Sequence, residues 1–248
     1  MVSFLLAFQF LTIIPIRIRR TPTKEDLVRS MRWYPLVGAA IGAISAALYW
    51  AALQVFSPEV AAVAGIVGLV ICSGALHLDG FADMCDGFYG GKDRERVLAI
   101  MKDSRSGAMA IVGVFFLLAF KIALLHGLEP RHAMLALTAI PMFGRWSMVW
   151  LCWVCTYARS EGGIGASYIG HVDPLTFWIA TLTCAVMAFL LLQARGLLMM
   201  AAAIAFAWLF RRVVEKRIGG MTGDTLGGCG EIVETLTLAV LSFHWMAG

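Results

Sequence analysis

Three aspartates in one short segment have side chains and a spacing that could bind a metal ion. Asp79, Asp83 and Asp86 lie within residues 77–87, which read HLDGFADMCDG. On a helix the spacings i, i+4 and i+7 put all three carboxylates on one face, where they repel each other. A hard divalent cation removes that repulsion, and Mg²⁺ takes carboxylate oxygens while bridging to substrate phosphates. The segment therefore predicts a metal site, with a solvated acidic patch at a helix end as the alternative.

Polar and basic residues around these aspartates are candidates for holding a phosphorylated substrate. His77 points roughly away from Asp79 on a helix, so it is either a substrate contact or an interfacial hydrogen-bonding residue. Arginine forks match phosphate oxygens bidentately, which suits a site that clamps phosphates beside a metal. A general excess of basic residues on one side of a membrane is the alternative explanation. The candidates that follow the acidic segment are Lys92, Arg94, Arg96, Asp103 and Arg105.

A second, glycine-rich segment carries further candidates. Residues 219–231 read GGMTGDTLGGCGE, and Asp224 and Glu231 are seven residues apart, on one helical face. Glycines let the backbone approach a ligand, and a turn before a helix N-terminus suits an anion. Close helix packing is the alternative reason for the glycines. We take Thr222, Asp224 and Glu231 as candidates, together with Arg159 from the loop 157–165, whose signal is weaker.

The elements that must position these residues are membrane helices. Hydrophobic residues make up 60% of the 248 and charged residues only 15%, against about 25% charged in soluble domains. A soluble fold does not hide so much apolar surface, so residues 1–248 are predicted to form one all-α, polytopic helix bundle in a membrane. Seven spans are expected, with an interfacial or re-entrant helix over 1–16, which is too short to cross. The spans are 35–56, 60–78, 107–126, 133–155, 174–193, 197–210 and 231–247.

Lysine and arginine are distributed very unevenly between the two sides of these spans. Sixteen fall in 17–32, 79–106, 156–173 and 211–230, and only Arg131 and Arg195 fall in the alternate connections. The positive-inside rule makes the sixteen-residue side cytoplasmic, so no nucleic-acid partner is needed to explain the net charge of +4. Lys121 and Arg145 fall inside spans, where charge is costly and points to function or to pairing.

The motifs together resemble one enzyme family, adenosylcobinamide-GDP ribazoletransferase, also called cobalamin synthase. The resemblance rests on residues 77–87 (HLDGFADMCDG), 102–107 (KDSRSG), 157–162 (YARSEG) and 219–228 (GGMTGDTLGG), in this order and at these spacings. Two departures occur. Ser73-Gly74-Ala75 stands where the family often has a glycine pair, and the loop after Arg159 is one residue longer.

The resemblance implies a function, a cofactor and a location. The expected reaction joins adenosylcobinamide-GDP with α-ribazole or its 5′-phosphate and releases GMP, the nucleotide-loop assembly step of cobalamin biosynthesis. Mg²⁺ and an inner-membrane location are implied, with the active site on the cytoplasmic face, formed from 77–107, 157–165 and 219–231. Asp79, Asp83 and Asp86 would hold the metal, and these three with Asp224 form the catalytic set. The sequence does not decide whether the protein forms a homo-oligomer or associates with other cobalamin-assembly enzymes.

Two other functions compete with this interpretation. A CDP-alcohol phosphotransferase of lipid synthesis also uses spaced aspartates at a membrane face. Its usual pattern is absent, because Asp79-Gly80 is followed by Phe81-Ala82-Asp83. An ion-coupled transporter would need acidic residues at mid-membrane and broken helices, whereas these acids are predicted at the cytoplasmic edge.

Overall fold

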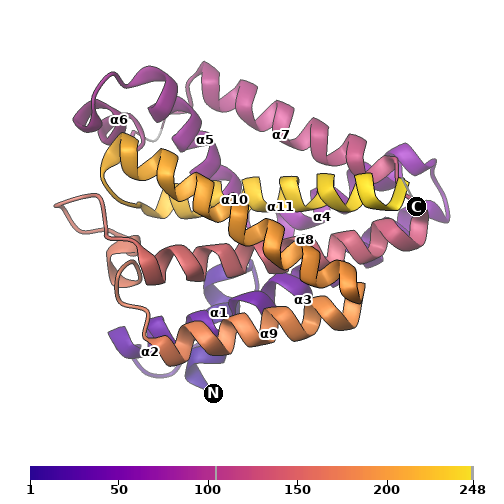
Figure 1. Cartoon of the computed structure of the whole chain (residues 1–248), viewed down its shortest axis with the longest axis horizontal. Helices are drawn as coiled ribbons and strands as arrows, with labels where there is room; N and C mark the ends of the chain where they lie inside the picture. The colour runs from indigo at the N-terminus through magenta and orange to yellow at the C-terminus, as the bar shows by residue number, and fades with distance from the viewer. Residues whose placement is uncertain (104, 247–248) are drawn as a thin grey trace.

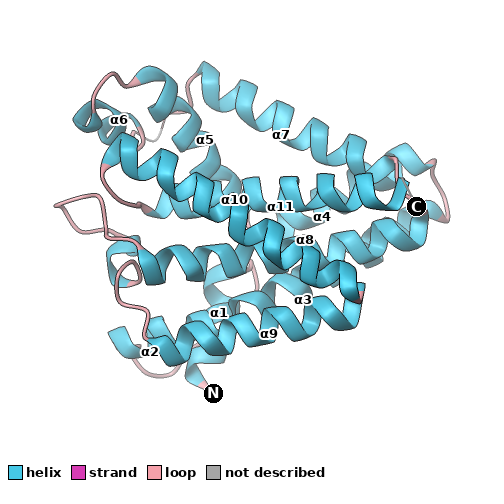
Figure 2. Ribbon diagram, viewed as in Figure 1, coloured by secondary structure: helices cyan, strands magenta, loops and turns pink. Residues whose placement is uncertain are grey.

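The computed structural model describes residues 1–103 and 105–246, and that part of the chain is helical without a named strand (Figures 1 and 2). Ser104, inside the 102–107 motif, and the end of the predicted 231–247 span lie outside the described residues. The helices are α1 (Val2–Leu11), α2 (Lys24–Ser30), α3 (Tyr34–Leu53), α4 (Pro58–Cys72), α5 (Leu76–Gly90), α6 (Arg94–Ile100), α7 (Ala108–His126), α8 (Pro130–Val154), α9 (Pro174–Leu192), α10 (Ala194–Ile218) and α11 (Gly223–Met246), with short 3₁₀ turns at Met31–Trp33 and Ile164–Ser167.

The predicted membrane helix bundle is confirmed. Six described helices are long and apolar enough to cross a membrane, and the bent pair α4 and α5 makes a seventh crossing if counted as one. The helix predicted over 197–210 continues to Ile218, past Arg211 and Arg212, as expected if those side chains snorkel to the surface. The N-terminal α1 has only ten residues, in keeping with an interfacial or re-entrant helix.

One predicted span differs in the structure. The stretch 60–78 is not a single helix, because α4 ends at Cys72 and α5 begins at Leu76 with a bend of 91° between them. Gly74 and Ala75 adopt left-handed backbone angles, φ 60° and φ 57°, which no helix continues through. For Ala75 this conformation costs about 1–2 kcal/mol. The break gives α5 a direction of its own, and α5 carries all three aspartates of the acidic segment.

The charged connections gather at one end of the bundle. In Figure 1 the helix α6, the loop after α8 and the start of α11 lie together at the left, while the turns after α3, α7 and α9 lie at the opposite end. Close helix contacts bring the bundle together. A Cβ on Gly38 of α3 would lie 2.5 Å from the carbonyl oxygen of Pro141 in α8, so only glycine permits this approach. The arrangement separates one polar end from a largely apolar body.

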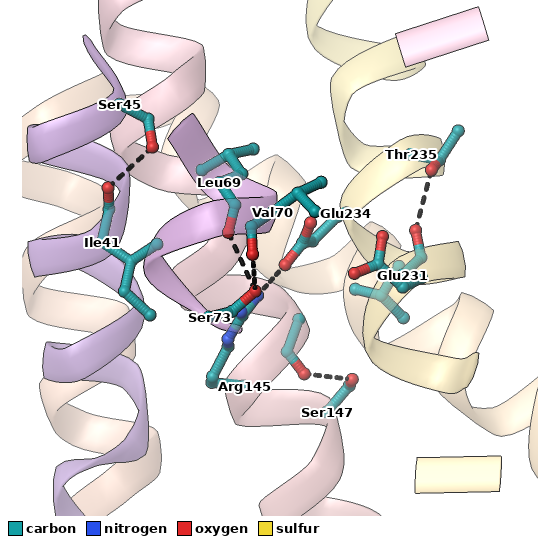
Figure 3. Close-up of polar contacts among 12 residues, drawn as sticks. Ile41, Ser45, Leu69, Val70, Ser73, Arg145, Ser147, Glu231, Glu234 and Thr235 are labelled. Carbon is teal, nitrogen blue, oxygen red and sulfur yellow. Dashed lines mark hydrogen bonds and ion pairs between the residues drawn. The ribbon is translucent and has the colours of Figure 1, made fainter. Parts of the chain in front are cut away.

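Four charged side chains are buried inside that apolar body. The Nζ of Lys121 on α7 lies 2.6 Å from the Oε2 of Glu231 and 2.8 Å from the Oε2 of Glu234, both on α11. Arg145 on α8 also pairs with Glu234, as Figure 3 shows. Two cations and two anions cancel, which is how charge is tolerated away from water. Of the two explanations for the charges within spans, the structure shows pairing for both Lys121 and Arg145.

Candidate active site

A pocket of about 220 Å³ opens where α5, α8, α11 and the loop after α8 meet at the polar end. Its wall is mostly apolar and aromatic, with Asp79, Asp224 and Arg159 as its charged members. The remaining lining residues come from seven segments of the chain: Phe10, Met31, Tyr34, Leu76, His77, Gly80, Met148, Cys152, Tyr157, Gly163, Ile164, Gly165, Tyr168, Gly223, Leu226 and Gly227. The pocket therefore joins an apolar interior to an acidic margin.

The acidic and glycine-rich segments lie directly against each other. A Cβ on Gly80 would lie 2.8 Å from the carbonyl oxygen of Asp224 and 3.0 Å from its Cα. A second contact occurs one turn further along α11, where a Cβ on Gly227 would lie 3.0 Å from the carbonyl oxygen of His77. Glycine at these positions allows α5 and α11 to approach at backbone distance. Residues about 140 positions apart in the sequence thus share one site, with Asp79 and Asp224 lining the same pocket.

The carboxylates of α5 form an uncompensated patch of negative charge. Asp79 is exposed and Asp83 is half-buried, and neither has a hydrogen-bond or ion-pair partner among the described residues. The Asp83 carboxylate is within electrostatic reach of Asp79, Asp86 and Asp224. Like charges this close repel, so the arrangement favours a cation or a proton at this place.

Asp86 is used differently from the other two aspartates. Its Oδ1 accepts a hydrogen bond of 2.8 Å from the backbone N–H of Ala110, and its Oδ2 accepts one from Gly107. A carboxylate in this position caps the N-terminus of α7 and interacts favourably with the helix dipole. The three aspartates lie on one continuous helix, with Asp79 and Asp86 both within electrostatic reach of Asp83, and Asp86 additionally contacts the start of α7.

The donor set suits magnesium, although no three His, Cys, Asp or Glu side chains converge on a point within the described ranges. Mg²⁺ is usually bound by one or two carboxylates, several waters and substrate phosphates, and not by an all-protein cage. Asp79 and Asp83 offer hard oxygen donors without a partner among the described residues, and Asp224 lies beside α5, within electrostatic reach of Asp83. The chemistry of these donors fits a cation that arrives together with a phosphorylated substrate.

Asp224 is held in place by the loop after α8. The Nη2 of Arg159 lies 2.8 Å from its Oδ2, and the hydroxyl of Thr222 lies 3.3 Å from the same oxygen. The loop is fixed by two backbone hydrogen bonds with Met221, whose N–H donates to Thr156 and whose carbonyl accepts from Ala158. Thr222 also accepts from the N–H of Thr225, which caps α11. Arg159 and Thr222 therefore orient the acidic group.

The predicted phosphate-binding arginines fall into two groups. Arg94 donates to the carbonyl oxygens of Ile218, at 2.8 Å, and Ala158, at 2.5 Å, so it ties α6 to the end of α10 and to the loop. Arg96 and Arg105 line a groove of about 340 Å³ next to Asp86. These two lie at the surface beside the acidic segment, and their binding of a phosphate stays a prediction.

Asp103 and Arg105 form an exposed pair at the edge of this groove. The Nη2 of Arg105 lies 2.7 Å from Asp103 Oδ2, and the guanidinium lowers the pKa of the Asp103 carboxyl to about 2. The carboxyl stays ionised at neutral pH and keeps the guanidinium next to the groove. Exposed pairs of this kind are weak, so Arg105 can exchange Asp103 for a phosphate.

Of the three remaining candidates, Lys92 and Glu231 lie away from the pocket and His77 lines it. Lys92 is exposed, and its backbone carbonyl is 3.4 Å from Nη1 of Arg217. Glu231 lies two turns into α11 within the buried ion cluster and contributes no atom to the pocket wall. His77 does line the pocket. It is 2% exposed, and neither ring nitrogen has a hydrogen-bond partner among the described residues.

Several residues of the site carry no distinctive signal in the sequence. Phe10, Tyr34 and Tyr168 line the pocket but stand in ordinary apolar surroundings along the chain. Glu234 is not among the predicted residues, although an acidic residue inside an apolar span, three positions after Glu231, is the kind of feature that predicts a buried pair. The aromatic residues become visible as a group only after the helices are assembled.

The comparisons with known proteins cover nearly the whole chain. Residues 3–242 match the family model described as cobalamin-5-phosphate synthase. The adenosylcobinamide-GDP ribazoletransferase of Desulforamulus reducens is 37% identical over 96% of this chain and 95% of its own length. The enzyme of the same name from Pseudomonas fluorescens is 38% identical over 98% and 99%. No solved structure matches. With a match of this extent and the shared motifs at one site, the chain belongs to the cobalamin-5-phosphate synthase family.

Proposed function

We propose that this protein joins adenosylcobinamide-GDP to α-ribazole or α-ribazole 5′-phosphate, giving adenosylcobalamin or its 5′-phosphate together with GMP. The single observation that carries the proposal is the meeting of the acidic segment of α5 with the glycine-rich start of α11 around one pocket. Relatives covering almost the whole chain bear the name of this activity. A CDP-alcohol phosphotransferase is not favoured by these relatives.

The reaction exchanges a pyrophosphate bond for a phosphate ester bond. A ribose hydroxyl of α-ribazole attacks the phosphorus on the cobinamide side, the bond to the bridging oxygen breaks, and GMP leaves with that oxygen. Phosphoryl transfer of this type depends mainly on positioning and on neutralising charge. The hydroxyl proton passes to a carboxylate, and we assign this role to Asp224, because Arg159 and Thr222 fix its orientation at the pocket margin.

Asp79 and Asp83 would hold Mg²⁺ in this scheme, with Asp86 fixing the start of α7 next to them. The metal would supply charge neutralisation at the pyrophosphate when bound. Arg96 and Arg105 would steady the phosphates from the adjacent groove, while Arg94 holds the loop that carries Arg159. Each of these residues thus binds the metal or the phosphates, orients a neighbouring segment, or accepts the proton.

The test of the function is direct. Purified protein in detergent is given adenosylcobinamide-GDP with and without α-ribazole, and released GMP and corrinoid product are measured together. We expect equal amounts of GMP and adenosylcobalamin, formed only when both substrates are present. GMP release that does not depend on α-ribazole would indicate hydrolysis and contradict the proposal, as would absence of product.

We further propose that the polar end of the bundle faces the cytoplasm in a cell inner membrane. The Lys/Arg asymmetry of sixteen to two supports this orientation. A reporter enzyme that is active only outside the cytosol should work when fused after Arg131 and fail when fused after Gly91. The reverse pattern would place the acidic site on the other side.

A further inference from the structure

The aromatic pocket beside Asp79 and Asp224 has a chemistry of its own. Tyr34 and Tyr168 are 1% and 5% exposed, and the ring of Phe10 packs against both, with its centroid 6.5 Å from that of Tyr34 and 5.7 Å from that of Tyr168. Met31 and Met148 complete a soft, apolar surface of the kind that accommodates a flat ring. The pocket is thus suited to an apolar aromatic group that carries a polar extension.

The size of the pocket limits what it can hold. About 220 Å³ is below the roughly 300–1,000 Å³ of pockets that enclose drug-sized ligands. A corrin ring system is too large for this space. A guanine base has several polar groups on its edges, and burying them against apolar walls without hydrogen bonds is costly. Among the parts of the proposed substrates, the bicyclic, dimethylated benzimidazole base of α-ribazole matches both the size and the polarity.

One polar group in the wall matches the one free nitrogen of that base. A benzimidazole nucleoside has a single unsubstituted ring nitrogen, which accepts a hydrogen bond. His77 is buried and lines the pocket, and both of its ring nitrogens are without a partner among the described residues. A buried, unsatisfied histidine is costly unless a ligand supplies its partner. Both nitrogens are inaccessible to water, so the imidazole would turn toward the pocket to donate its N–H to the base nitrogen.

The pocket reaches from this aromatic interior to the candidate carboxylates. With the base in the aromatic interior, the attached ribose lies at the margin, where Asp79 and Asp224 are found. We propose that this pocket is the α-ribazole subsite, in which the aromatic wall binds the benzimidazole base and holds the ribose hydroxyls at the carboxylates. The inference rests on the proposed function and adds where one of its two substrates binds.

Binding of radiolabelled α-ribazole to the full-length protein tests the subsite without requiring turnover. Ile164 lines the pocket and is 71% exposed, so Ile164→Trp narrows the entrance with little expected effect on folding. Met148→Trp fills the interior instead. Ile111→Trp is the matched control, because Ile111 is 65% exposed on α7 and lies outside the pocket. Thermal midpoints in detergent verify that each variant is folded.

We expect Ile164→Trp and Met148→Trp to weaken α-ribazole binding at least tenfold, and Ile111→Trp to change it less than twofold. Ile164→Trp should leave the KM for adenosylcobinamide-GDP within twofold of the wild-type value. An analogue that lacks the two methyl groups should bind roughly tenfold more weakly, because two buried carbons are lost. Unlabelled α-ribazole should displace the radiolabelled ligand, and a phospholipid should not.

The outcomes separate the subsite from the reaction. Normal α-ribazole binding by a folded Ile164→Trp protein, with GMP released by the wild type, would overturn the subsite alone. Binding lost in both pocket variants, with no GMP released by the wild type, would support the subsite and contradict the reaction. Displacement of radiolabelled α-ribazole by a phospholipid would overturn the subsite. So would pocket variants that change only the KM for adenosylcobinamide-GDP.

Discussion

Two regions of this protein use the same residue types in opposite ways. At the polar end, Asp79 and Asp83 lie near each other without a partner among the described residues. In the apolar body, Lys121, Glu231, Glu234 and Arg145 are almost fully buried and pair with one another. The polar end has an excess of negative charge at an accessible surface. The buried cluster has no excess charge, because its two cations and two anions cancel.

The difference teaches which charges in a membrane protein point to a ligand. A buried cluster whose charges cancel needs no counter-ion, and Figure 3 shows Arg145 and Glu234 directed at each other between α8 and α11. An accessible cluster of like charges is incomplete without a counter-ion. We therefore assign catalysis to the polar end and helix assembly to the buried cluster, and each prediction below alters one region while the other is monitored.

Removing the counter-ion should have the largest effect on activity. We expect EDTA to abolish product formation and added Mg²⁺ to restore it, because Asp79 and Asp83 have no other partner among the described residues that neutralises their charge. The thermal midpoint of the protein should stay nearly unchanged, since Asp79 and Asp83 make no hydrogen bond or ion pair among the described residues that holds the helices together. Product formation at the untreated rate in EDTA would contradict a metal at the polar end.

Removing a charge from the buried cluster should affect folding instead. Glu234→Gln leaves Lys121 and Arg145 with too little negative charge, and breaking a buried pair in this way costs about 3–5 kcal/mol. The expected result is a lower thermal midpoint and a smaller yield of monodisperse protein. Glu59→Gln is the control, because Glu59 is exposed and its ion pair with His126, at 3.6 Å, lies at the surface. An unchanged midpoint for Glu234→Gln would mean that the cluster does not stabilise the bundle.

Neutralising Asp224 should reduce turnover with little effect on substrate affinity. Loss of the proton acceptor predicts a fall of at least about a hundredfold, the low end of what general-base assistance supplies. Binding of adenosylcobinamide-GDP by Asp224→Asn should remain within a few-fold of the wild type. Glu95→Gln is the control, because Glu95 is exposed and lies outside the pocket. Normal turnover by Asp224→Asn would mean that the glycine-rich segment serves only helix packing.

Much of this organisation can be predicted from the sequence. Apolar runs indicate the membrane helices, and the spacing of Asp79, Asp83 and Asp86 indicates an acidic site from the residue types alone. The charge asymmetry places that site and the glycine-rich segment on one side. Each of these signals is local, or a simple sum along the chain, so no tertiary contact is needed to read it.

The features that the sequence does not predict depend on tertiary contacts. Nothing in 73–75 specifies a bend of 91°, since Ala75 adopts a left-handed backbone only because the surrounding helices hold it there. The capping role of Asp86 requires knowing that α7 begins beside α5. Arg94 is predicted to bind phosphate, yet its two hydrogen bonds to backbone carbonyls arise from segments 64 and 124 positions away.

The most direct measurement compares Asp79→Asn with Lys121→Met, scoring turnover per folded molecule and thermal midpoint for both. We expect Asp79→Asn to lose at least about a hundredfold in turnover, because a metal ligand is removed. Its thermal midpoint should be unchanged or higher, because repulsion between carboxylates is relieved. Lys121→Met should show a lower midpoint and yield while its folded fraction keeps near-normal turnover. Normal turnover by Asp79→Asn, or lost turnover without lost stability in Lys121→Met, would contradict the assignment of chemistry to the polar end.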